Sequence, residues 1–284
     1  MDLYQNRLVA MLDVLGFDSK ISSSAANLLN IMQEYVPLTR DAKTAALSPR
    51  PVEGSPSTPP PNFEIAEFVF DTLVLVSKPI SPKSVGDFIL STCELMEKFF
   101  AHQYPLRGAI SLGSVAVDQE PHIFLSDAFK RLSRYGDAQN WAGCVILPEA
   151  EDLVVENLLG DLDCHVARQS SAICKISPPW KIEKVPQDFL DRSFWCLNWS
   201  YFLQKEIVQE GLNFLKGDRE KFEGTRRYLD QQLTLPDDLQ LLPDDFAPAK
   251  TFKCMKARSS ARMAFSDADG NPAQPNGEFS VSFY

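Results

Sequence analysis

The chain has 284 residues, of which 44% are hydrophobic and 23% charged, the proportions of an ordinary globular protein. Its net charge of −10, from 28 Lys and Arg against 38 Asp and Glu, disfavours nucleic-acid and anionic membrane partners. No apolar run approaches the roughly 20 residues that cross a bilayer, and residues 1–7 lack the layout of a secretory signal. We therefore expect a cytoplasmic protein.

The cysteines and histidines show no metal-binding spacing. The six cysteines include no C-x-x-C pair, which is typical of buried thiols in a reducing compartment rather than of a disulfide frame or a zinc site. The histidines are isolated, so a structural or simply exposed position is expected for each. The residues are Cys93, Cys144, Cys164, Cys174, Cys196 and Cys254, with His102, His122 and His165.

Two apolar runs, each with a single carboxylate, dominate the first part of the chain. Residues 8–17 read LVAMLDVLGF and carry Asp13, and residues 68–76 read FVFDTLVLV and carry Asp71, within a segment read as one strand over 63–77. A carboxylate flanked by hydrocarbon is unfavourable to bury unless a cation or hydrogen bonds compensate it. Two such acids on neighbouring strands predict a metal site.

The segment after the first strand changes character twice. Gly16 follows a strand expected over 7–15, and apolar spacing over 21–35 predicts a helix, whose first N–H groups can face a polyphosphate. Residues 40–62 are rich in Pro and Ser and are expected to form a mobile loop within the domain. A linker between two domains is the alternative, because structureless loops of this length are uncommon inside compact domains.

The chain then alternates between helical and strand patterns up to residue 150. A helix is expected to pack on the sheet, followed by a β-hairpin, a second helix and a short strand. The order predicts an α+β fold with a ferredoxin-like βαββαβ sheet over residues 1–150. The expected elements are the helix 85–102, the hairpin strands 106–117 and 122–125, the helix 127–135 and the strand 144–147.

Residues 151–284 have a weaker pattern and are expected to form a C-terminal α/β extension. This extension would pack on the first domain or brace a dimer of it. The expected elements are helices at 151–159, 201–215 and 219–233, strands at 172–176 and 180–184, an aromatic-rich segment at 193–199, and a short helix holding Phe252 and Met255.

Three motifs, in this order and at about this spacing, resemble those of class III nucleotide cyclases. They read LDVLGF at 12–17, FDTLVL at 70–75 and RGAISLG at 107–113. The divergent segment 127–143, which ends QNWAG, is similar to the stand-alone pyrimidine cyclases of the bacterial Pycsar anti-phage system. The resemblance covers about residues 7–150.

The resemblance implies a homodimer that converts a nucleoside triphosphate into a 3′,5′-cyclic monophosphate and diphosphate. It implies two Mg²⁺ or Mn²⁺ ions per site, held by Asp13, Asp71 and the backbone carbonyl of Val14. One ion favours ionisation of the ribose 3′-hydroxyl, and the other neutralises the triphosphate as diphosphate leaves. Oxygen ligands of this kind suit both ions.

Cationic side chains complete the implied site, because negative charge builds on the α-phosphoryl oxygens in the transition state. The family uses an Asn and an Arg, four residues apart, from the partner protomer. In this chain the Asn position aligns with Lys130, so the Asn is replaced, and the Arg position aligns with Arg134. Arg131, one turn earlier, is the other candidate for the Arg position. For Lys130 the alternative is a position on a solvated helix face. Arg107 aligns with a family residue that contacts the terminal phosphates, and the alternative for Arg107 is a surface ion pair. Further nucleotide contacts are expected from Leu15, Gly16 and Phe17.

The positions that read the base differ from those of purine cyclases. Those enzymes carry a Lys and an Asp at places that fall near Glu67 and Ile123, so the purine pair is missing. This favours a pyrimidine, with UTP preferred over CTP on the resemblance alone. Tyr135 and Trp141 are candidates for narrowing the base pocket, although aromatic residues near a helix end more often belong to the core.

The first hypothesis is a metal-dependent uridylate cyclase whose cyclic UMP activates a separate anti-phage effector protein. A cytidylate cyclase that makes cyclic CMP is the nearest alternative. An alternative from another class is a catalytically silent nucleotide-binding dimerisation module. A polymerase-like or diguanylate-forming palm is disfavoured, because neither a Gly-Gly-Asp/Glu-Glu-Phe signature nor a basic template surface is present.

Overall fold

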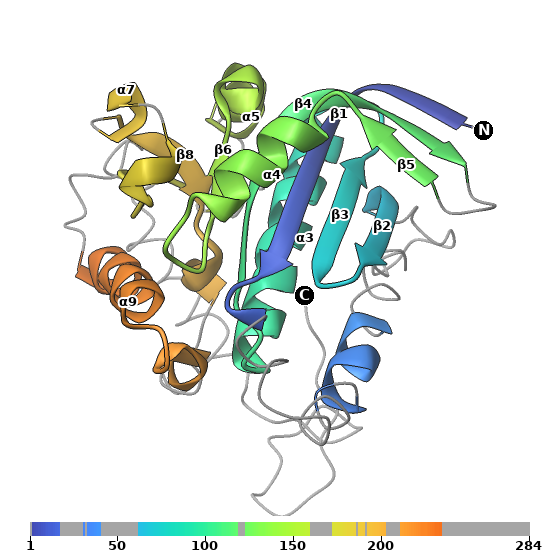
Figure 1. Ribbon diagram of the computed structural model, residues 1–284. Helices are drawn as coiled ribbons and strands as arrows, with labels where there is room; N and C mark the ends of the chain where they lie inside the picture. Colours follow the sequence, from blue (N-terminus) through green and yellow to red (C-terminus); the bar gives the residue numbers. More distant parts are fainter. Residues whose placement is uncertain are drawn as a thin grey trace, which may run out of the picture. The chain divides into compact units, whose positions relative to one another are not determined.

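One mixed sheet runs through the part of the chain that the computed structural model describes, which comprises residues 2–17, 31, 33–40, 62–118, 123–159, 172–185, 187–190, 192–202 and 211–234. Its order is β2-β3-β1-β4-β6-β8-β7, with β5 paired to β4 (Figure 1). The strands are β1 (Asp2–Val14), β2 (Phe63–Val69), β3 (Thr72–Ser77), β4 (Leu106–Asp118), β5 (Ile123–Ser126), β6 (Cys144–Ile146), β7 (Ile173–Ile176) and β8 (Phe194–Leu197).

Strand β1 lies in the middle and pairs antiparallel with both β3 and β4. The chain passes from β1 through helical residues 33–40 to the β2–β3 hairpin, and then through α3 (Pro82–Ala101) to β4. These elements form a βαββαβ unit with the spatial order β2-β3-β1-β4, which is the ferredoxin-like arrangement. The predicted α+β class is therefore confirmed.

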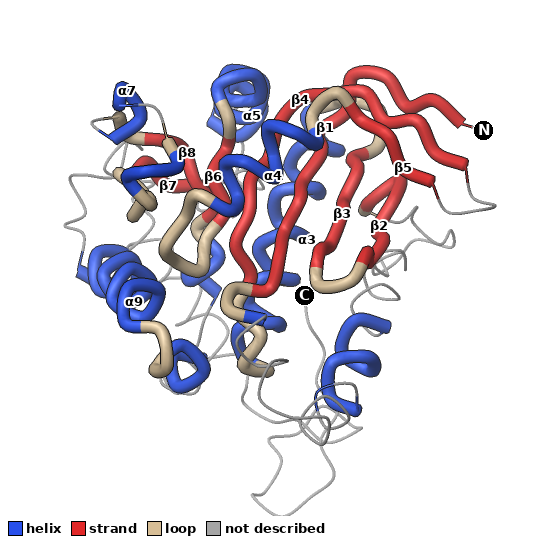
Figure 2. The backbone as a smooth tube through the Cα atoms, viewed as in Figure 1, coloured by secondary structure: helices blue, strands red, loops and turns tan. Residues whose placement is uncertain are grey.

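Helices cover both faces of the sheet, with α4 (Phe129–Asp137) in front of β1 and β4 and α3 behind them (Figures 1 and 2). The start of α3 is set locally, because Ser81 and Ser84 form a reciprocal capping box and Pro82 occupies the first turn. Its apolar face, including Phe88 and Phe99, is buried in the core. The predicted helix at 85–102 is thus confirmed with an earlier start.

The interpretation of residues 63–77 as one strand is wrong. Phe70 and Asp71 form a two-residue turn between β2 and β3, with Val69 opposite Thr72. Phe70 has a φ of 59°, in the left-handed region that disfavours a bulky side chain, and its side chain is 93% exposed. The turn lacks the Asn-Gly or Gly-rich signal of hairpins, so the apolar run reads as continuous. Asp71 is therefore a turn residue, and not a mid-strand acid.

A second error concerns residues 180–184, where a strand was expected. Only Trp180 makes a β-bridge, to Gln139, and a 3₁₀ helix follows at η1 (Ile182–Lys184). The hairpin β4–β5 and the strands β6 and β7 agree with the predictions within a few residues, whereas β8 lies in the segment 193–199, which was predicted only as aromatic-rich. The remaining helices are α5 (Pro148–Leu159), α7 (Gln187–Leu190), η2 (Trp199–Phe202), a turn of helix at 211–215 and α9 (Arg219–Thr234).

The sheet does not end at the boundary expected near residue 150. Strand β6 pairs with β8, and β8 pairs with β7, so segments from both sides of that boundary share one sheet. Residues 1–51 and 57–234 belong to one compact unit. Almost all of the predicted loop at 40–62 lies outside the described residues, as do most of the predicted helix at 21–35 and the predicted helix with Phe252 and Met255.

The described cysteines are free thiols that behave as core residues. Cys93, Cys144 and Cys196 are buried, and burial raises the pKa of each thiol well above its ordinary value. Burial also raises the pKa of Cys174, to about 12. This agrees with the prediction of buried free thiols, while Cys164 and Cys254 lie outside the described residues.

Strand β4 approaches β1 very closely at Gly108. A Cβ atom at this position would lie 2.0 Å from the Met11 carbonyl oxygen and 2.9 Å from the Leu12 Cα. These two backbone atoms belong to the central strand β1. They cannot move aside, whereas the end of a flexible side chain could. Only glycine therefore fits beside Arg107 in this register.

Replacing Phe70 with Gly should stabilise the protein, by about 0.5 to 1 kcal/mol, because it relieves left-handed strain and removes an exposed side chain. Asn6→Gly is the control, since Asn6 also has a positive φ, of 51°, and Asn tolerates this region. Urea denaturation would measure both variants. A destabilised Phe70→Gly would contradict the strain argument.

Gly108→Ala should destabilise the protein by about 3 kcal/mol or more, because the new methyl group overlaps backbone atoms of β1. Gly217→Ala is the control, because a Cβ at Gly217 meets no atom within 4 Å. Thermal and urea unfolding of both variants would check this expectation. Equal stability of the two variants would show that β1 and β4 can separate at this point without loss.

Candidate functional site

The two acids expected to bind metal lie at neighbouring strand ends. Asp13 is the penultimate residue of β1, opposite Thr72, and the next residue, Val14, donates its N–H to the Asp71 carbonyl over 3.2 Å. The structure thus places the β2–β3 turn directly beside the end of β1. Both acids belong to the same end of the sheet, although they lie 58 positions apart in the sequence (71 − 13).

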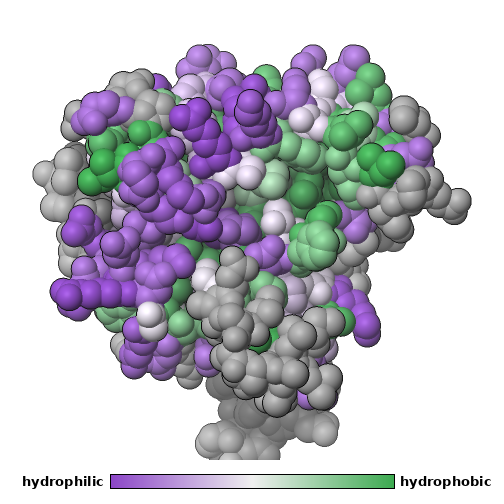
Figure 3. Space-filling view, viewed as in Figure 1, coloured by the Kyte–Doolittle hydropathy of each residue, from purple (hydrophilic) through white to green (hydrophobic). Residues whose placement is uncertain are grey.

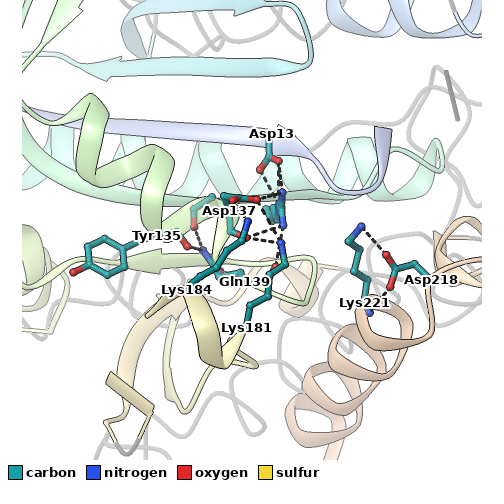
Figure 4. A network of polar contacts seen from close by, with 10 residues as sticks. Asp13, Tyr135, Asp137, Gln139, Lys181, Lys184, Asp218 and Lys221 are labelled. Carbon is teal, nitrogen blue, oxygen red and sulfur yellow. Dashed lines mark hydrogen bonds and ion pairs between the residues drawn. The ribbon is translucent and has the colours of Figure 1, made fainter. Parts of the chain in front are cut away.

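Arg107, the second residue of β4, lies opposite Asp13 in the strand register and binds the Asp13 carboxylate, which is labelled in Figure 4. The Arg107 Nε lies 3.1 and 3.0 Å from the two Asp13 oxygens, and Nη2 lies 2.9 Å from Oδ2. The same Nη2 donates to an Asp137 oxygen over 3.2 Å, and Nη1 donates to the backbone carbonyls of Asp137 and Gln139 over 3.2 and 3.0 Å. These contacts engage all five N–H groups of the guanidinium.

The Arg107 side chain is only 10% exposed, so its pairing is not the surface ion pair that was considered from the sequence. The Asp13 side chain is 27% exposed. A bidentate Arg–carboxylate pair of this kind is strong and directional, and removing either partner leaves a poorly solvated charge. In this arrangement Arg107 already has a protein partner at the position where a phosphate contact was expected.

Asp137, at the end of α4, gathers three cationic side chains. Its carboxylate contacts Arg107, Lys181 Nζ at 3.4 Å, and Lys184 Nζ, and the Asp137 carbonyl accepts a 2.6 Å bond from Lys181. Burial acts to raise the pKa of Asp137, but the Lys184 hydrogen bond and the charges of Lys181 and Arg107 together hold this pKa below its ordinary value. Burial lowers the pKa of Lys181, and Arg107 lowers it further.

The loop after α4 is fixed to the segment that carries these lysines. Two backbone hydrogen bonds, of 2.7 and 2.8 Å, join residues 179–181 to residues 138–140. The Gln139 side chain is fully buried and donates to the carbonyls of Gly108, over 2.6 Å, and Tyr135, over 3.0 Å. Strand β4, the end of α4 and the 179–184 segment are thereby held together around Arg107.

The oxygen donors at this end of the sheet suit Mg²⁺ or Mn²⁺ when phosphate oxygens complete the set. Among the described residues, no group of three or more His, Cys, Asp or Glu side chains is placed to hold a metal ion. Asp13 and Asp71 remain as a pair of hard carboxylate ligands, and phosphate oxygens can complete such a set. The donor chemistry therefore fits, but a cation must compete with Arg107 for Asp13.

The turn after β1 uses part of its backbone within the chain. The Leu15 N–H donates to the Pro105 carbonyl over 2.8 Å, so this N–H already has a partner other than phosphate. Gly16 has a φ of 85°, which the turn requires and glycine supplies. Phe17 packs on the buried ring of Tyr35, at 5.0 Å between centroids. Nucleotide contacts of Gly16 and Phe17 stay a prediction.

Tyr35 connects this turn to the second acid. It is buried among aromatic rings that include Phe68, Phe99 and Tyr104. Burial, followed by the negative charge of Asp71, raises its pKa well above the ordinary value. The aromatic cluster therefore supports the end of the sheet where the two acids lie.

The cationic residues of α4 differ in their surroundings. Lys130 and Arg134 are exposed, and the Arg134 guanidinium lies 5.8 Å from the centre of the Tyr135 ring. Arg131 is tied to its own chain, because it pairs with Glu149 at 3.4 Å. This favours Arg134 over Arg131 as the residue that could reach a partner protomer.

The candidate base-pocket residues divide between core and surface. Trp141 is fully buried, with its ring 4.6 Å from that of Tyr228, and so belongs to the core. Tyr135 stacks on Phe189 at 5.0 Å, with the ring planes 7° apart. Ile123 is 49% exposed at the start of β5. The pocket role considered for Trp141 is therefore not supported, whereas that of Tyr135 stays a prediction.

Sequence reasoning missed Asp137, Gln139, Lys181 and Lys184. No spacing rule connects an aspartate at a helix end with lysines more than 40 positions later. The only local signal is that Gln139 begins the QNWAG segment, whose polar first residue precedes a buried stretch. The pairing of residues 138–140 with 179–181 is a tertiary contact, which the sequence pattern does not reveal.

Comparison with known proteins gives likeness at the level of structure alone. No family model matches the sequence, and no curated protein matches it significantly. Similar solved structures include the adenylyl cyclase CyaB from P. aeruginosa, with 11% identity and a TM-score of 0.42, covering 69% of this chain and 95% of that one. Another is a bacterial light-regulated adenylyl cyclase, with 12% identity and a TM-score of 0.40, covering 74% and 100%.

A third similar structure is a class III adenylyl cyclase-like ATP-binding protein from Pseudomonas aeruginosa. It shares 13% identity, with a TM-score of 0.38, and the match covers 76% of this chain and 45% of that one. The fold class rests on the strand order of this chain.

In the described ranges, every helix is too short or too polar to span a bilayer.

Acid should weaken the fold partly through Asp137. Because the folded-state pKa of this carboxyl is lowered, its contribution to stability is present above the unfolded pKa of about 3.9 and is lost as the pH falls through the lower folded value. Asp137→Asn should therefore show a shallower decline of melting temperature below about pH 4 than wild type. Parallel declines of the two proteins between pH 5 and pH 3 would contradict this assignment.

Proposed function

We propose that this protein is a metal-dependent nucleotide cyclase that converts UTP to 3′,5′-cyclic UMP and diphosphate. The observation that supports it is that the Arg107–Asp13 ion pair and the turn that carries Asp71 lie at one end of the sheet. Such a combination can bind a cation and a phosphate side by side. The pyrimidine preference rests on the sequence resemblance and on the missing purine-reading pair.

In this mechanism Asp13, Asp71 and the Val14 carbonyl would hold Mg²⁺ or Mn²⁺. Bound ions would favour ionisation of the 3′-hydroxyl and offset the charge of the leaving diphosphate. Arg107 binds the terminal phosphates after it releases Asp13. Arg134, exposed on α4, stabilises negative charge on the α-phosphoryl oxygens in the partner protomer's site.

A homodimer with shared sites is part of the proposal. Apolar side chains are exposed at the start of β1, at the end of β2 and its turn, and along β5, where Figure 3 shows green surface patches. Exposed apolar groups of this kind commonly mark a contact with another chain. The residues are Leu3, Val69, Phe70, Ile123 and Leu125.

The proposed product acts as a messenger on a separate anti-phage effector.

A catalytically silent nucleotide-binding module is the second candidate, and one observation favours it. Arg107 satisfies the Asp13 carboxylate without a cation, so the site is electrostatically complete as it stands. A silent module would bind a triphosphate and release it unchanged. Mass spectrometry after incubation with Mn²⁺ and each of the four nucleoside triphosphates separates the two candidates.

Asp71→Asn should abolish product formation, with a loss of about 100-fold or more, because an amide is a poor ligand for a divalent cation. The fold should be retained, since Asp71 is a turn residue and Asn suits turns. Asp87→Asn, on α3 beside Lys83, is the matched control and should keep full activity. Product formation by Asp71→Asn near the wild-type rate would remove Asp71 from the mechanism.

Mixing Asp71→Asn with Arg134→Ala protomers should restore activity, because a heterodimer would contain one composite site with both residues intact. Each variant alone should be nearly inactive. The measurement is the rate of cyclic nucleotide formation after the two proteins are co-refolded or co-expressed. Absence of any recovery in verified heterodimers would count against sites shared between protomers.

A further inference from the structure

Arg107 is held by two sets of partners on opposite edges of its guanidinium. One edge, formed by Nε and one N–H of Nη2, faces the Asp13 carboxylate. The other three N–H groups bind the Asp137 carboxylate and the carbonyls of Asp137 and Gln139. Loss of Asp13 would therefore leave three of the five hydrogen bonds in place and would free only one edge.

The second set of partners is itself firmly fixed. The Asp137 carboxylate is bound by Lys181 and Lys184 from the 179–184 segment, and Lys181 also binds its carbonyl. Gln139 is anchored to the Gly108 carbonyl on the strand that carries Arg107. Asp137 is 49% exposed, yet its position is fixed by side chains from two other segments of the chain, β4 and 179–184. It can hold Arg107 whether or not Asp13 does.

We propose that Asp137, fixed by Lys181 and Lys184, is a positioning residue that holds Arg107 in place while Asp13 exchanges the guanidinium for a divalent cation. The edge that Asp13 leaves is the Nε–Nη2 edge, whose two parallel donors match the oxygens of a phosphate. A cation on Asp13 and a phosphate on Arg107 then replace one internal ion pair by two ligand contacts. The inference rests on the proposed function for the identity of the cation and the triphosphate.

This exchange couples the two ligands. A cation that takes Asp13 exposes the phosphate-binding edge, and a phosphate that takes this edge releases Asp13, so each ligand should raise the affinity for the other. Asp137 keeps the opened state favourable, because without it the released, largely buried guanidinium would have no carboxylate partner among the contacts described above. Removing its charge should therefore weaken cation binding even though Asp137 is not a ligand.

The test compares Asp137→Asn with Asp218→Asn in the full-length protein. Asp218 lies apart from the residues around Asp137 in Figure 4, pairs with Lys221 at 2.6 Å, and caps α9, a role that Asn also performs well. Calorimetric titration with Mn²⁺ alone, and with Mn²⁺ plus a non-hydrolysable UTP analogue, gives the affinities. We expect about fivefold to tenfold weaker Mn²⁺ binding in Asp137→Asn and wild-type binding in Asp218→Asn.

Each result of this comparison decides the matter. Equal Mn²⁺ affinities of Asp137→Asn and wild type, or equal weakening in both variants, would overturn the positioning role while leaving the proposed function intact. Absence of Mn²⁺ and nucleotide binding by the wild type would overturn both. Weaker Mn²⁺ binding in Asp137→Asn alone, together with no cyclic product when the wild type is incubated with UTP itself, would remove the cyclase activity but retain the exchange.

Arg107→Met provides a second measurement of the exchange. Because this variant lacks the competitor for Asp13, a folded sample should bind Mn²⁺ alone more tightly than wild type, and the UTP analogue more weakly. Addition of Asp137→Asn to Arg107→Met should then have no further effect on Mn²⁺ affinity. Unchanged Mn²⁺ affinity in folded Arg107→Met would overturn the exchange, and if this variant does not fold, the Asp137→Asn result decides.

Discussion

The pairing of Arg107 with Asp13 and Asp137 is the interaction on which the site depends. A guanidinium that is almost fully buried must find acceptors for all its N–H groups, and here two carboxylates and two carbonyls provide them. These acceptors come from β1, from the end of α4 and from the loop that follows it. One side chain therefore fixes the relative position of the central strand and the helix that covers it.

The second structural constraint is the close approach of β4 to β1. Gly108 allows the two strands to meet without a side chain between them, and this places Arg107 directly opposite Asp13 in the register. The neighbouring hairpin supplies Asp71 at the end of β1, through its backbone bond to Val14. The Arg107–Asp13 pair and the turn that carries Asp71 thus share one end of the sheet because three strands end together, and each strand is held by ordinary ladder hydrogen bonds.

The C-terminal part of the described chain takes part in this site instead of forming a separate body. Strands β7 and β8 extend the sheet, and the 179–184 segment brings two lysines to Asp137. A bridge between Trp180 and Gln139 connects these lysines to the buried loop after α4. Changes in this segment can therefore alter the electrostatics around Arg107 without touching the strands that carry the acids.

Local patterns in the sequence were sufficient to predict the central strands, the long helix α3, the β4–β5 hairpin and the α+β class, because apolar periodicity records which face of each element is buried. They also singled out Asp13 and Asp71, since carboxylates inside apolar runs are conspicuous, whereas Arg107 was expected from the resemblance to class III cyclases. Only the tertiary structure decided that Asp71 lies in a turn, that Arg107 holds Asp13, and that Asp137 and two distant lysines complete the group. The physical reason is that ion pairing depends on distances in space, which strand register and helix packing determine and which separation along the chain does not reveal.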